Sequence, residues 1–311
     1  MSETHSTNLW LHRFAVLTAV ATFPLVFVGG LVTSTGSALA VPDWPTTFGH
    51  NMFLYPLSGM VGGILYEHSH RLLGALVGFF TVILTVWLWL KEPRRWLRWL
   101  GTVALATVIL QGVLGGLRVV LLAHMLAIVH ACVAQAFFAL LVSIACFTSP
   151  TRPTQAAEFP PASLTRLRRL CASTTAVIYL QIIFGAILRH TGARLDAHLV
   201  LAALVVVLAI AVNMSVWRQQ AEENAVVQPT MLLSGLLLAQ LSLGLGAYLV
   251  KYTPMAVLAT PGLRISLTTS HLAMGSLVLA SSLMLTLRAY RLRTAPTPMI
   301  ARTLLSQQVS L

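Results

Sequence analysis

Long runs of apolar side chains alternate with short polar segments along this chain. A helix needs about 20 mainly apolar residues to cross the hydrocarbon core of a bilayer. Eight runs come close to that length, and we place them at residues 14–35, 69–90, 97–118, 125–147, 170–189, 198–216, 230–250 and 268–287. The pattern predicts an all-α integral membrane protein with eight transmembrane helices.

The longest polar segment runs from Thr148 to Arg169 and contains four prolines. It separates four apolar runs from four others, so we expect two halves, residues 1–150 and 169–311, joined by a cytoplasmic linker at 151–168. The first apolar run is too long for the core of a signal peptide, and we expect it to be retained as a helix. The fold class predicted is two pseudo-repeated four-helix bundles.

Two residue pairs recur at fixed places in these runs. Every even-numbered run carries a histidine followed four residues later by a small residue, and three odd-numbered runs carry a glutamine followed four residues later by a glycine. The histidine pairs are His70 with Gly74, His130 with Ala134, His198 with Ala202, and His271 with Gly275. The glutamine pairs are Gln111 with Gly115, Gln181 with Gly185, and Gln240 with Gly244, while the first run has Gly29 and Gly30 without a glutamine. This repetition supports a duplicated bundle.

Composition agrees with a membrane protein and adds its orientation. The chain is 57% hydrophobic and 9% charged, which leaves too little polar surface for a water-soluble fold. An N-terminus inside the cell puts 14 of the 20 lysines and arginines in cytoplasmic segments and six outside. The positive-inside rule therefore predicts that both termini are cytoplasmic. The net charge of +12 reflects this topology, and no nucleic-acid partner is expected.

Cysteines and the remaining histidines carry weaker signals. Cys132, Cys146 and Cys171 fall within apolar runs without metal-type spacing, so we expect packing residues and no disulfide. Solvated roles are expected for His5, His12 and His50, an outer-rim role for His68, and interfacial positions for His124 and His190, where a haem propionate could be bonded.

The four repeated histidines are the main candidates for chemistry. In the predicted topology each lies in the outer part of its helix, so all four share one depth near one membrane face. Neutral imidazole is a common iron ligand, and a small residue one turn away leaves room for a flat macrocycle. Two histidines per half suggest two bis-histidine haem sites, with iron favoured over zinc because each ligand comes from a separate helix. Histidines that hydrogen-bond between helices are the structural alternative.

One carboxylate breaks the symmetry of the halves. Glu67 precedes His70 by three residues and so shares its helical face, whereas no acidic residue precedes the other three histidines at that spacing. A proton-handling group in one copy suggests that this copy reacts. Alternatively, Glu67 forms a surface ion pair with Arg71.

The connection between the first two runs contains Pro42-Asp43-Trp44-Pro45 and carries no lysine or arginine. Long loops of this kind are often functional lids. Asp43 is a candidate for orienting Arg71, and Arg71 itself for contacting a propionate. Trp44 is either part of such a lid or an ordinary interfacial aromatic.

These motifs resemble the haem A synthase family of bacterial cytochrome oxidase assembly proteins, which includes CtaA. The resemblance is carried by Pro42-Asp43-Trp44-Pro45, by Glu67-His68-Ser69-His70-Arg71, and by His130, His198-Leu199 and His271-Leu272. It covers nearly the whole chain, although many bacterial members have a cysteine pair in the first external loop that this sequence lacks.

The resemblance implies a membrane-bound, haem-dependent oxidoreductase of the bacterial inner membrane. It implies that haem O binds at His70 and His130, with Glu67 needed for its oxidation, and that haem b binds at His198 and His271. The C8 methyl of haem O would become a formyl group by successive hydroxylations, giving haem A for terminal oxidases. Implied partners are a haem O synthase, the assembling oxidase and an electron donor of unknown identity.

Two other classes compete with this interpretation. A dihaem b cytochrome that carries electrons between quinone and a periplasmic partner explains the four histidines equally well, but not Glu67 or the loop. A secondary transporter explains the internal repeat and would hold no haem.

Overall fold

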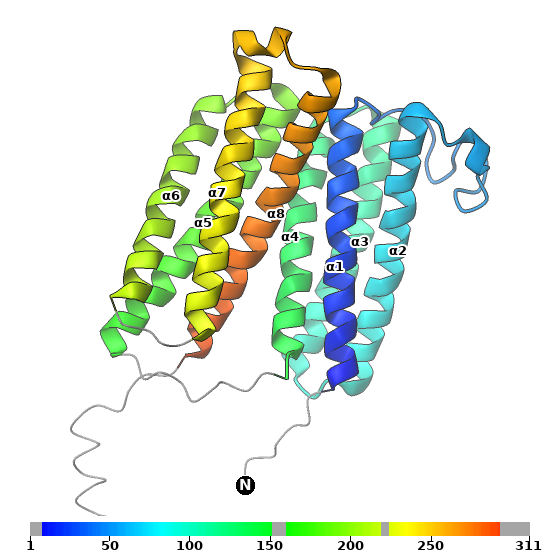
Figure 1. Cartoon of the computed structure of the whole chain (residues 1–311). Helices are drawn as coiled ribbons and strands as arrows, with labels where there is room; N and C mark the ends of the chain where they lie inside the picture. The colour runs from blue at the N-terminus through cyan, green and yellow to red at the C-terminus, as the bar shows by residue number, and fades with distance from the viewer. Residues whose placement is uncertain (1–7, 151–159, 219–223, 293–311) are drawn as a thin grey trace, which may run out of the picture.

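Eight long α-helices account for the eight predicted spans (Figure 1). The computed structural model describes residues 8–150, 160–218 and 224–292. The helices are α1 (Leu9–Ser34), α2 (Gly62–Lys91), α3 (Arg95–Leu121), α4 (His124–Thr148), α5 (Pro161–Thr191), α6 (Leu195–Trp217), α7 (Asn224–Tyr252) and α8 (Pro261–Arg291). Short 3₁₀ helices η1 (Leu57–Gly59) and η2 (Pro254–Val257) lie in two connections. Each long helix is apolar enough to cross a membrane, which confirms the predicted fold class.

Several helices begin earlier than their apolar runs. α5 begins at Pro161 and α8 at Pro261, because proline at a first helical position has a suitable φ and needs no hydrogen-bond partner for its missing N–H. These first turns carry polar residues, so hydropathy placed the starts at 170 and 268. The predicted linker 151–168 was therefore too long at its C-terminal end, while residues 151–159 lie outside the described part of the chain.

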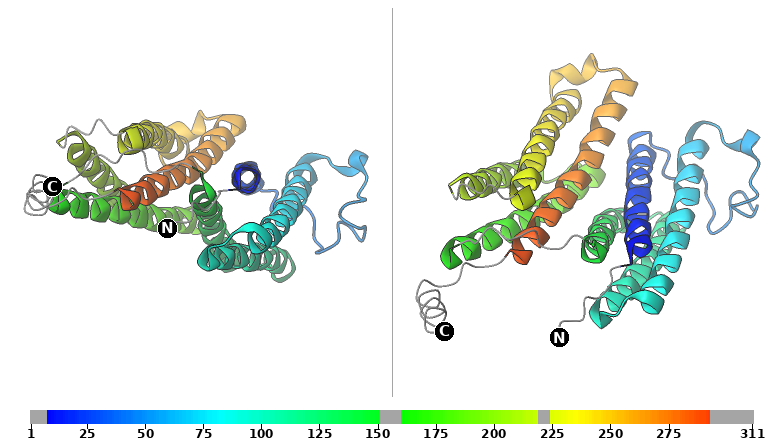
Figure 2. Two further views of the ribbon diagram at one scale, coloured as in Figure 1. Left: turned by 90° about the horizontal axis from the view of Figure 1, so that it is seen from below. Right: turned by 60° about the horizontal axis from the view of Figure 1, so that its bottom comes forward.

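The helices form two similar groups that lie side by side (Figures 1 and 2). In the first group each of α1–α4 packs against the next helix and α4 returns to α1. In the second group α5–α8 repeat this closed arrangement. The groups meet where α8 packs against α1 and α4, and where α4 packs against α5. This arrangement agrees with the predicted pseudo-repeated bundles.

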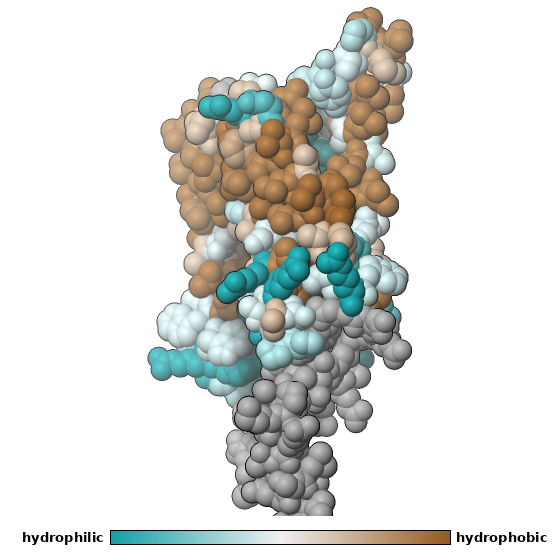
Figure 3. All heavy atoms as spheres, turned by 90° about the vertical axis from the view of Figure 1, so that its left-hand side faces the viewer, coloured by the Kyte–Doolittle hydropathy of each residue, from teal (hydrophilic) through white to brown (hydrophobic). Residues whose placement is uncertain are grey.

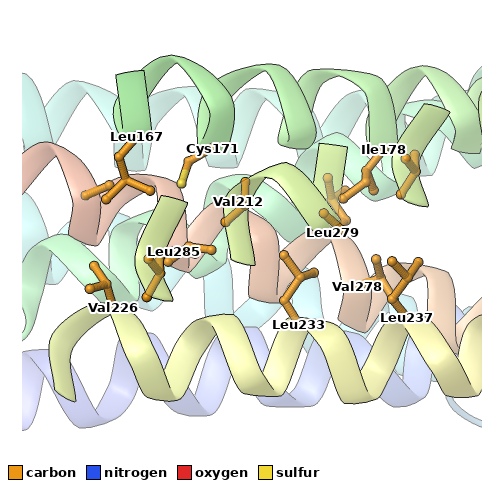
Figure 4. Close-up of a cluster of buried hydrophobic side chains, with 14 of the residues drawn as sticks. Leu167, Cys171, Ile178, Val212, Val226, Leu233, Leu237, Val278, Leu279 and Leu285 are labelled. Carbon is orange, nitrogen blue, oxygen red and sulfur yellow. The ribbon is translucent and has the colours of Figure 1, made fainter. Parts of the chain in front are cut away.

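Each bundle has its own apolar core. One cluster of buried side chains comes from α1–α4 with Ala280 of α8, and the other comes from α5–α8 and the residue that follows α8. Figure 4 shows the second cluster, in which Cys171 packs among leucine, isoleucine and valine side chains. All three cysteines are free, as predicted, and Cys171 serves as a small packing residue.

A buried arginine joins the two bundles. Nη2 of Arg189, on α5, donates to the carbonyl oxygen of Gly30 at 2.8 Å and to the hydroxyl of Ser34 at 2.6 Å, both on α1. Its Nη1 donates to the carbonyl of Thr268 on α8 at 3.3 Å, and Ser34 also bonds to Thr269 at 2.7 Å. Without a hydrophobic driving force between helices in lipid, such hydrogen bonds help to set which helices associate.

The bundle has two chemically different ends. We call the end where α2, α4, α6 and α8 begin the histidine end, and the opposite end, where α1 begins, the basic end. Figure 3 shows a band of hydrophobic side chains over the helices, with several hydrophilic ones below it. The polar side chains at this end belong to the segments that the distribution of lysine and arginine assigns to the cytoplasm.

Two arginines and a histidine at the basic end cap the C-terminus of α4. Nδ1 of His12 bonds to the carbonyl of Ala145 at 3.1 Å, Arg291 donates to Cys146 O at 2.8 Å, and Arg94 donates to Phe147 O at 3.0 Å. Two of these carbonyls also accept a local hydrogen bond, Ala145 O from the Thr148 hydroxyl at 3.1 Å and Cys146 O from the Ser149 N–H at 3.4 Å. The positive charges of Arg291 and Arg94 near this helix end are favourable. The prediction that His12 is solvated was wrong because His12 belongs to α1 and packs against α4.

Replacing Arg94 by alanine should lower the stability of the protein by about 2 kcal/mol, because charged hydrogen bonds to Phe147 O and to the buried Glu92 carboxylate are lost together. The readout is the apparent melting temperature in detergent. Arg95→Ala is the matched control, since this neighbouring arginine is exposed. Equal melting temperatures for the two variants would contradict the capping role of Arg94.

Candidate functional site

The four repeated histidines form two close pairs at the histidine end. His70 of α2 and His130 of α4 have ring centroids 6.4 Å apart, with their planes inclined by 78°. His198 of α6 and His271 of α8 have centroids 6.3 Å apart and planes inclined by 76°. Each pair comes from one bundle, so the structure brings the predicted residues together as two equivalent sites.

Each imidazole lies directly against a glycine of the preceding odd-numbered helix. A Cβ added to these glycines would meet the histidine Cε1 at 3.3 Å or less, which leaves no space for a side chain. The distances are 2.9 Å for Gly29 and His70, 3.3 Å for Gly115 and His130, 3.0 Å for Gly185 and His198, and 2.8 Å for Gly244 and His271. The repeated glycines therefore seat the imidazoles against backbone.

The small residues one turn after the histidines have different surroundings. Near Gly74 the closest atom to an added Cβ is Leu25 Cδ1 at 4.0 Å, whereas Gly275 has the amide nitrogen of Gln240 at 3.4 Å. The expectation that these residues make room for a macrocycle therefore fits Gly74 better than Gly275.

The repeated glutamines also face the histidines. In the second bundle Nε2 of Gln181 lies 3.4 Å from Nε2 of His198, and Nε2 of Gln240 lies 3.4 Å from Nε2 of His271. An amide NH₂ can only donate, so these contacts favour the tautomer with a free lone pair on the histidine Nε2. Nδ1 of His271 then donates to the backbone carbonyl of Gln240, at 3.2 Å.

The first bundle lacks these contacts to the histidine rings. Gln111 donates to the backbone carbonyl of His130 at 3.0 Å, and the place one turn before Gly29 is held by Leu25. No side-chain amide is therefore recorded at the ring nitrogens of His70 or His130 within the described residues. The two sites share a geometry but differ in how their imidazoles are held.

The spacing of both pairs fits an iron atom with two axial histidines. With metal–nitrogen bonds of about 2.0 Å and ring nitrogens about 1.2 Å from the ring centres, two such imidazoles have centroids about 6.4 Å apart. Nδ1 of His70, His130 and His198 is buried without a hydrogen-bond partner. Among the described residues no group of three or more metal-binding side chains occurs, so a compact zinc-type site is not seen there.

Glu67 lies on the first turns of α2 and is 4% exposed. Its Oε1 accepts a hydrogen bond from Arg71 Nη2 at 2.8 Å, and its Oε2 accepts one from the N–H of Val41 at 3.0 Å. The ion pair considered as an alternative is therefore present, but it is buried beneath the outer loop. Because the pair is buried, its charges interact more strongly with neighbouring groups than the charges of an exposed pair would.

Arg71 fastens the outer loop over this carboxylate. Its Nη1 donates to the carbonyls of Asp43 at 2.7 Å and Thr46 at 3.0 Å, and its Nη2 donates to the carbonyl of Val41 at 3.0 Å. Both terminal nitrogens are thus bonded to protein. Arg71 therefore meets Asp43 through the main-chain oxygen of Asp43, and its contact with a propionate stays a prediction.

Asp43 stabilises a turn within the loop. Its carboxylate accepts hydrogen bonds from the N–H groups of Phe48 at 2.8 Å and Gly49 at 2.9 Å, and from the hydroxyl of Thr46. Partial burial would raise the pKa of Asp43, but these bonds, led by that from Gly49, lower it to about 2. The turn therefore keeps this stabilisation at neutral pH and loses it only as the pH falls towards 2.

Trp44 docks the loop onto α3. A Cβ added to Gly116 would lie 2.3 Å from Trp44 Cδ2, so the indole rests on the helix backbone beside Gly115, which contacts His130. Trp44 is also 40% exposed. One part of the indole thus lies against α3 and the other at the surface, and the choice between a lid and an interfacial aromatic stays a prediction.

His68 is more deeply buried than the outer-rim role predicted from the sequence. It is 1% exposed, its Nδ1 bonds to the hydroxyl of Thr47 at 3.1 Å, and its ring lies 5.1 Å from that of Tyr55. It anchors the loop on the helix face next to His70. The spacing of two residues indicated that His68 and His70 project from different faces of the helix. It did not indicate that the outer loop covers His68.

Three further histidines and His5 are not members of the two pairs. His50 is exposed in the loop, where its ring meets Tyr55 at 6.0 Å between centroids. His190 lies in the last turn of α5. His5 and the side chain of His124 are outside the described part of the chain.

Comparison with known proteins agrees with the family resemblance that the sequence motifs carry. Residues 55–198 match the family COX15-CtaA, described as cytochrome oxidase assembly protein. This segment includes Glu67, His70, His130 and His198.

Curated relatives match over parts of their length. "Heme A synthase" of Alkalihalophilus pseudofirmus is 34% identical over 113 residues, which are 35% of this chain and 36% of that protein. "Heme A synthase" of Halalkalibacterium halodurans is 28% identical over 197 residues, or 60% of this chain and 62% of that protein. The chain thus spans about a third of the first relative and less than two thirds of the second. It is similar to the cytochrome oxidase assembly family over residues 55–198 and to heme A synthases over parts of their length.

Proposed function

We propose that this chain is a haem A synthase of the bacterial inner membrane. It oxidises the C8 methyl of haem O to a formyl group by successive hydroxylations, giving haem A for terminal oxidases. The observation that carries the proposal is the pair of equivalent bis-histidine sites of which one, His70 with His130, has a buried carboxylate beside it. The names of the curated relatives support the same activity.

The two bundles divide the work in this proposal. Residues 1–150 bind haem O through His70 and His130, and residues 169–311 hold haem b through His198 and His271. The contact of His271 supports this assignment, because its Nδ1 donates to the backbone carbonyl of Gln240 and so orients the ring with Nε2 as the candidate ligand atom. The first pair has Leu25 and an open Gly74 beside it, which suits a group that must enter and leave.

The haem groups supply the oxidative and electron-transfer chemistry when bound. The protein would supply His70 and His130 as iron ligands and would place the Glu67 carboxylate beside them. Glu67 can accept a proton there or stabilise positive charge that develops near it. Arg71 and the N–H of Val41 orient this carboxylate, while Trp44 and the loop limit access of water from the histidine end.

The basic end lies in the cytoplasm in this proposal, and both termini lie there too. The histidine end then faces the outer side of the membrane. Partners are the haem O synthase that makes the substrate, the oxidase that receives haem A, and an electron donor.

Co-expression with a haem O synthase in a host that lacks haem A tests the activity. Extraction and mass measurement of the haems should reveal the alcohol intermediate and haem A. If haem O accumulates unchanged while the purified protein contains two bis-histidine haems, the protein is not a haem A synthase.

A dihaem electron carrier is the second candidate. The near equality of the two pairs, 6.4 and 6.3 Å, favours it because a carrier needs no difference between its sites. The same co-expression separates the two functions, since a carrier leaves haem O unchanged. An optical spectrum without a Soret band would instead favour a transporter.

A further inference from the structure

Cations at the histidine end differ in what they contact. Arg71 is bonded to the outer loop and Glu67, and Arg189 is bonded to α1 and α8. Arg264 donates to the carbonyl of Ala256 at 2.9 Å. Each of these side chains has a structural task within the protein.

Arg118 has no such task in the described structure. It lies on α3 at the spacing that places Gln111, Gly115 and Arg118 on one helical face, the face that contacts His130. It is half-buried, and no hydrogen-bond partner for its guanidinium occurs among the residues that the structure describes. A guanidinium has five donors, so leaving all of them without a partner near the membrane is unfavourable.

The charges around Arg118 do not neutralise the positive charge of its guanidinium. It lies within electrostatic range of His70, His130 and Glu67. Glu67 is already paired with Arg71 at 2.8 Å, and these two charges largely cancel. His190 on α5 is also within range of His130, and it adds no negative charge. The first site therefore carries one excess positive charge just outside its histidine pair.

Arg189 holds the corresponding place at the second site, but its guanidinium is hydrogen-bonded. Arg189 follows Gly185 by four residues, as Arg118 follows Gly115 by three, so each histidine pair has one arginine about one turn further outward. Arg189 is committed to three oxygen atoms of α1 and α8. Arg118 remains available to a ligand.

We infer that Arg118 binds a carboxylate of the macrocycle that occupies the His70 and His130 site. This inference rests on the proposed function, since haem O carries two propionates. A planar guanidinium binds a carboxylate through two parallel hydrogen bonds, which fixes orientation as well as adding affinity. With the iron held by the histidines and one propionate held by Arg118, the macrocycle cannot rotate in its plane, so one edge is presented to Glu67.

Titration of the purified full chain with two iron porphyrins tests this role. One ligand is iron protoporphyrin, which has two free carboxylates, and the other is its dimethyl ester, which has none. The change in the Soret band on bis-histidine binding gives the affinity. Wild-type protein should bind the diacid more tightly, and Arg118→Gln should weaken diacid binding about 10- to 100-fold while changing ester binding by less than about threefold.

Arg264→Gln is the matched control, since it removes another arginine of the histidine end and should leave both affinities unchanged. Arg118→Lys should restore part of the preference for the diacid through charge alone. The inference is overturned if Arg118→Gln weakens both ligands equally, or neither. Failure of the proposed function looks different: haem O would then stay unconverted in the co-expression experiment, whatever the affinities of the Arg118 variants.

Discussion

Glu67→Gln should reduce the formation of haem A at least 100-fold while leaving the haem content of the protein unchanged. Glutamine has almost the same shape and keeps one of the two acceptor oxygens, whereas its NH₂ group can only donate. Arg71 still bonds to the main-chain carbonyls of the outer loop, so the loop should stay in place. It lacks the negative charge and the basicity that a proton acceptor needs, and such groups typically contribute factors of 10² to 10⁴. The measurement is haem A per unit of protein after co-expression with a haem O synthase.

Asp196→Asn is the matched control for this charge. Asp196 lies in the first turn of α6, two residues before His198, and is exposed. Its replacement should leave haem A formation within about twofold, because exposed charges are screened. A similar yield for Glu67→Gln and wild type would show that Glu67 only holds the loop, and loss of bound haem from Glu67→Gln would make its role structural.

The eight helices and the histidine pairs were predictable from the sequence because both depend on local pattern. Hydropathy identifies a span without knowledge of its neighbours, since lipid imposes the same requirement on every helix. The pairs followed from the repeat, because duplicated bundles place equivalent residues at equivalent depth. His70 thus paired with His130, and His198 with His271, as expected.

The contacts that hold the sites could not be predicted in this way. Arg71 binds carbonyl oxygens of the outer loop, and any residue could supply those oxygens, so the sequence carries no signal for them. His68 is buried by the same loop, and His12 bonds to α4, more than a hundred residues away in the sequence. Such contacts depend on how distant segments pack.

The glycines illustrate the same limit. Their spacing from the glutamines was visible, but their partner was not, because a glycine on one helix and a histidine on the next are matched only when the helices pack. Once the helices pack, a Cβ added to Gly29, Gly115, Gly185 or Gly244 would lie 3.3 Å or less from an imidazole carbon. Because the imidazoles lie so close to these glycines, we expect a second large effect when one of the glycines is replaced.

Gly244→Val should weaken haem binding in the second bundle tenfold or more. An added Cβ lies 2.8 Å from Cε1 of His271 and 3.2 Å from its Nδ1, closer than real atoms approach, so the imidazole must move. Displacing a ligand through the residue that orients it costs about 10- to 100-fold in metal affinity. The measurement is the haem retained per protein after purification, with the spectrum reporting how much remains bis-histidine.

Gly235→Val separates this effect from the general cost of valine in a helix. Gly235 lies on the same helix as Gly244, but an added Cβ there meets no atom within 4 Å. Both variants lose the same backbone freedom and gain the same side chain, so their difference measures the clash with His271. If the two variants retain equal amounts of haem, Gly244 does not position His271. If only Gly244→Val loses one of the two haems, the repeated glycine helps to position the histidine ligand.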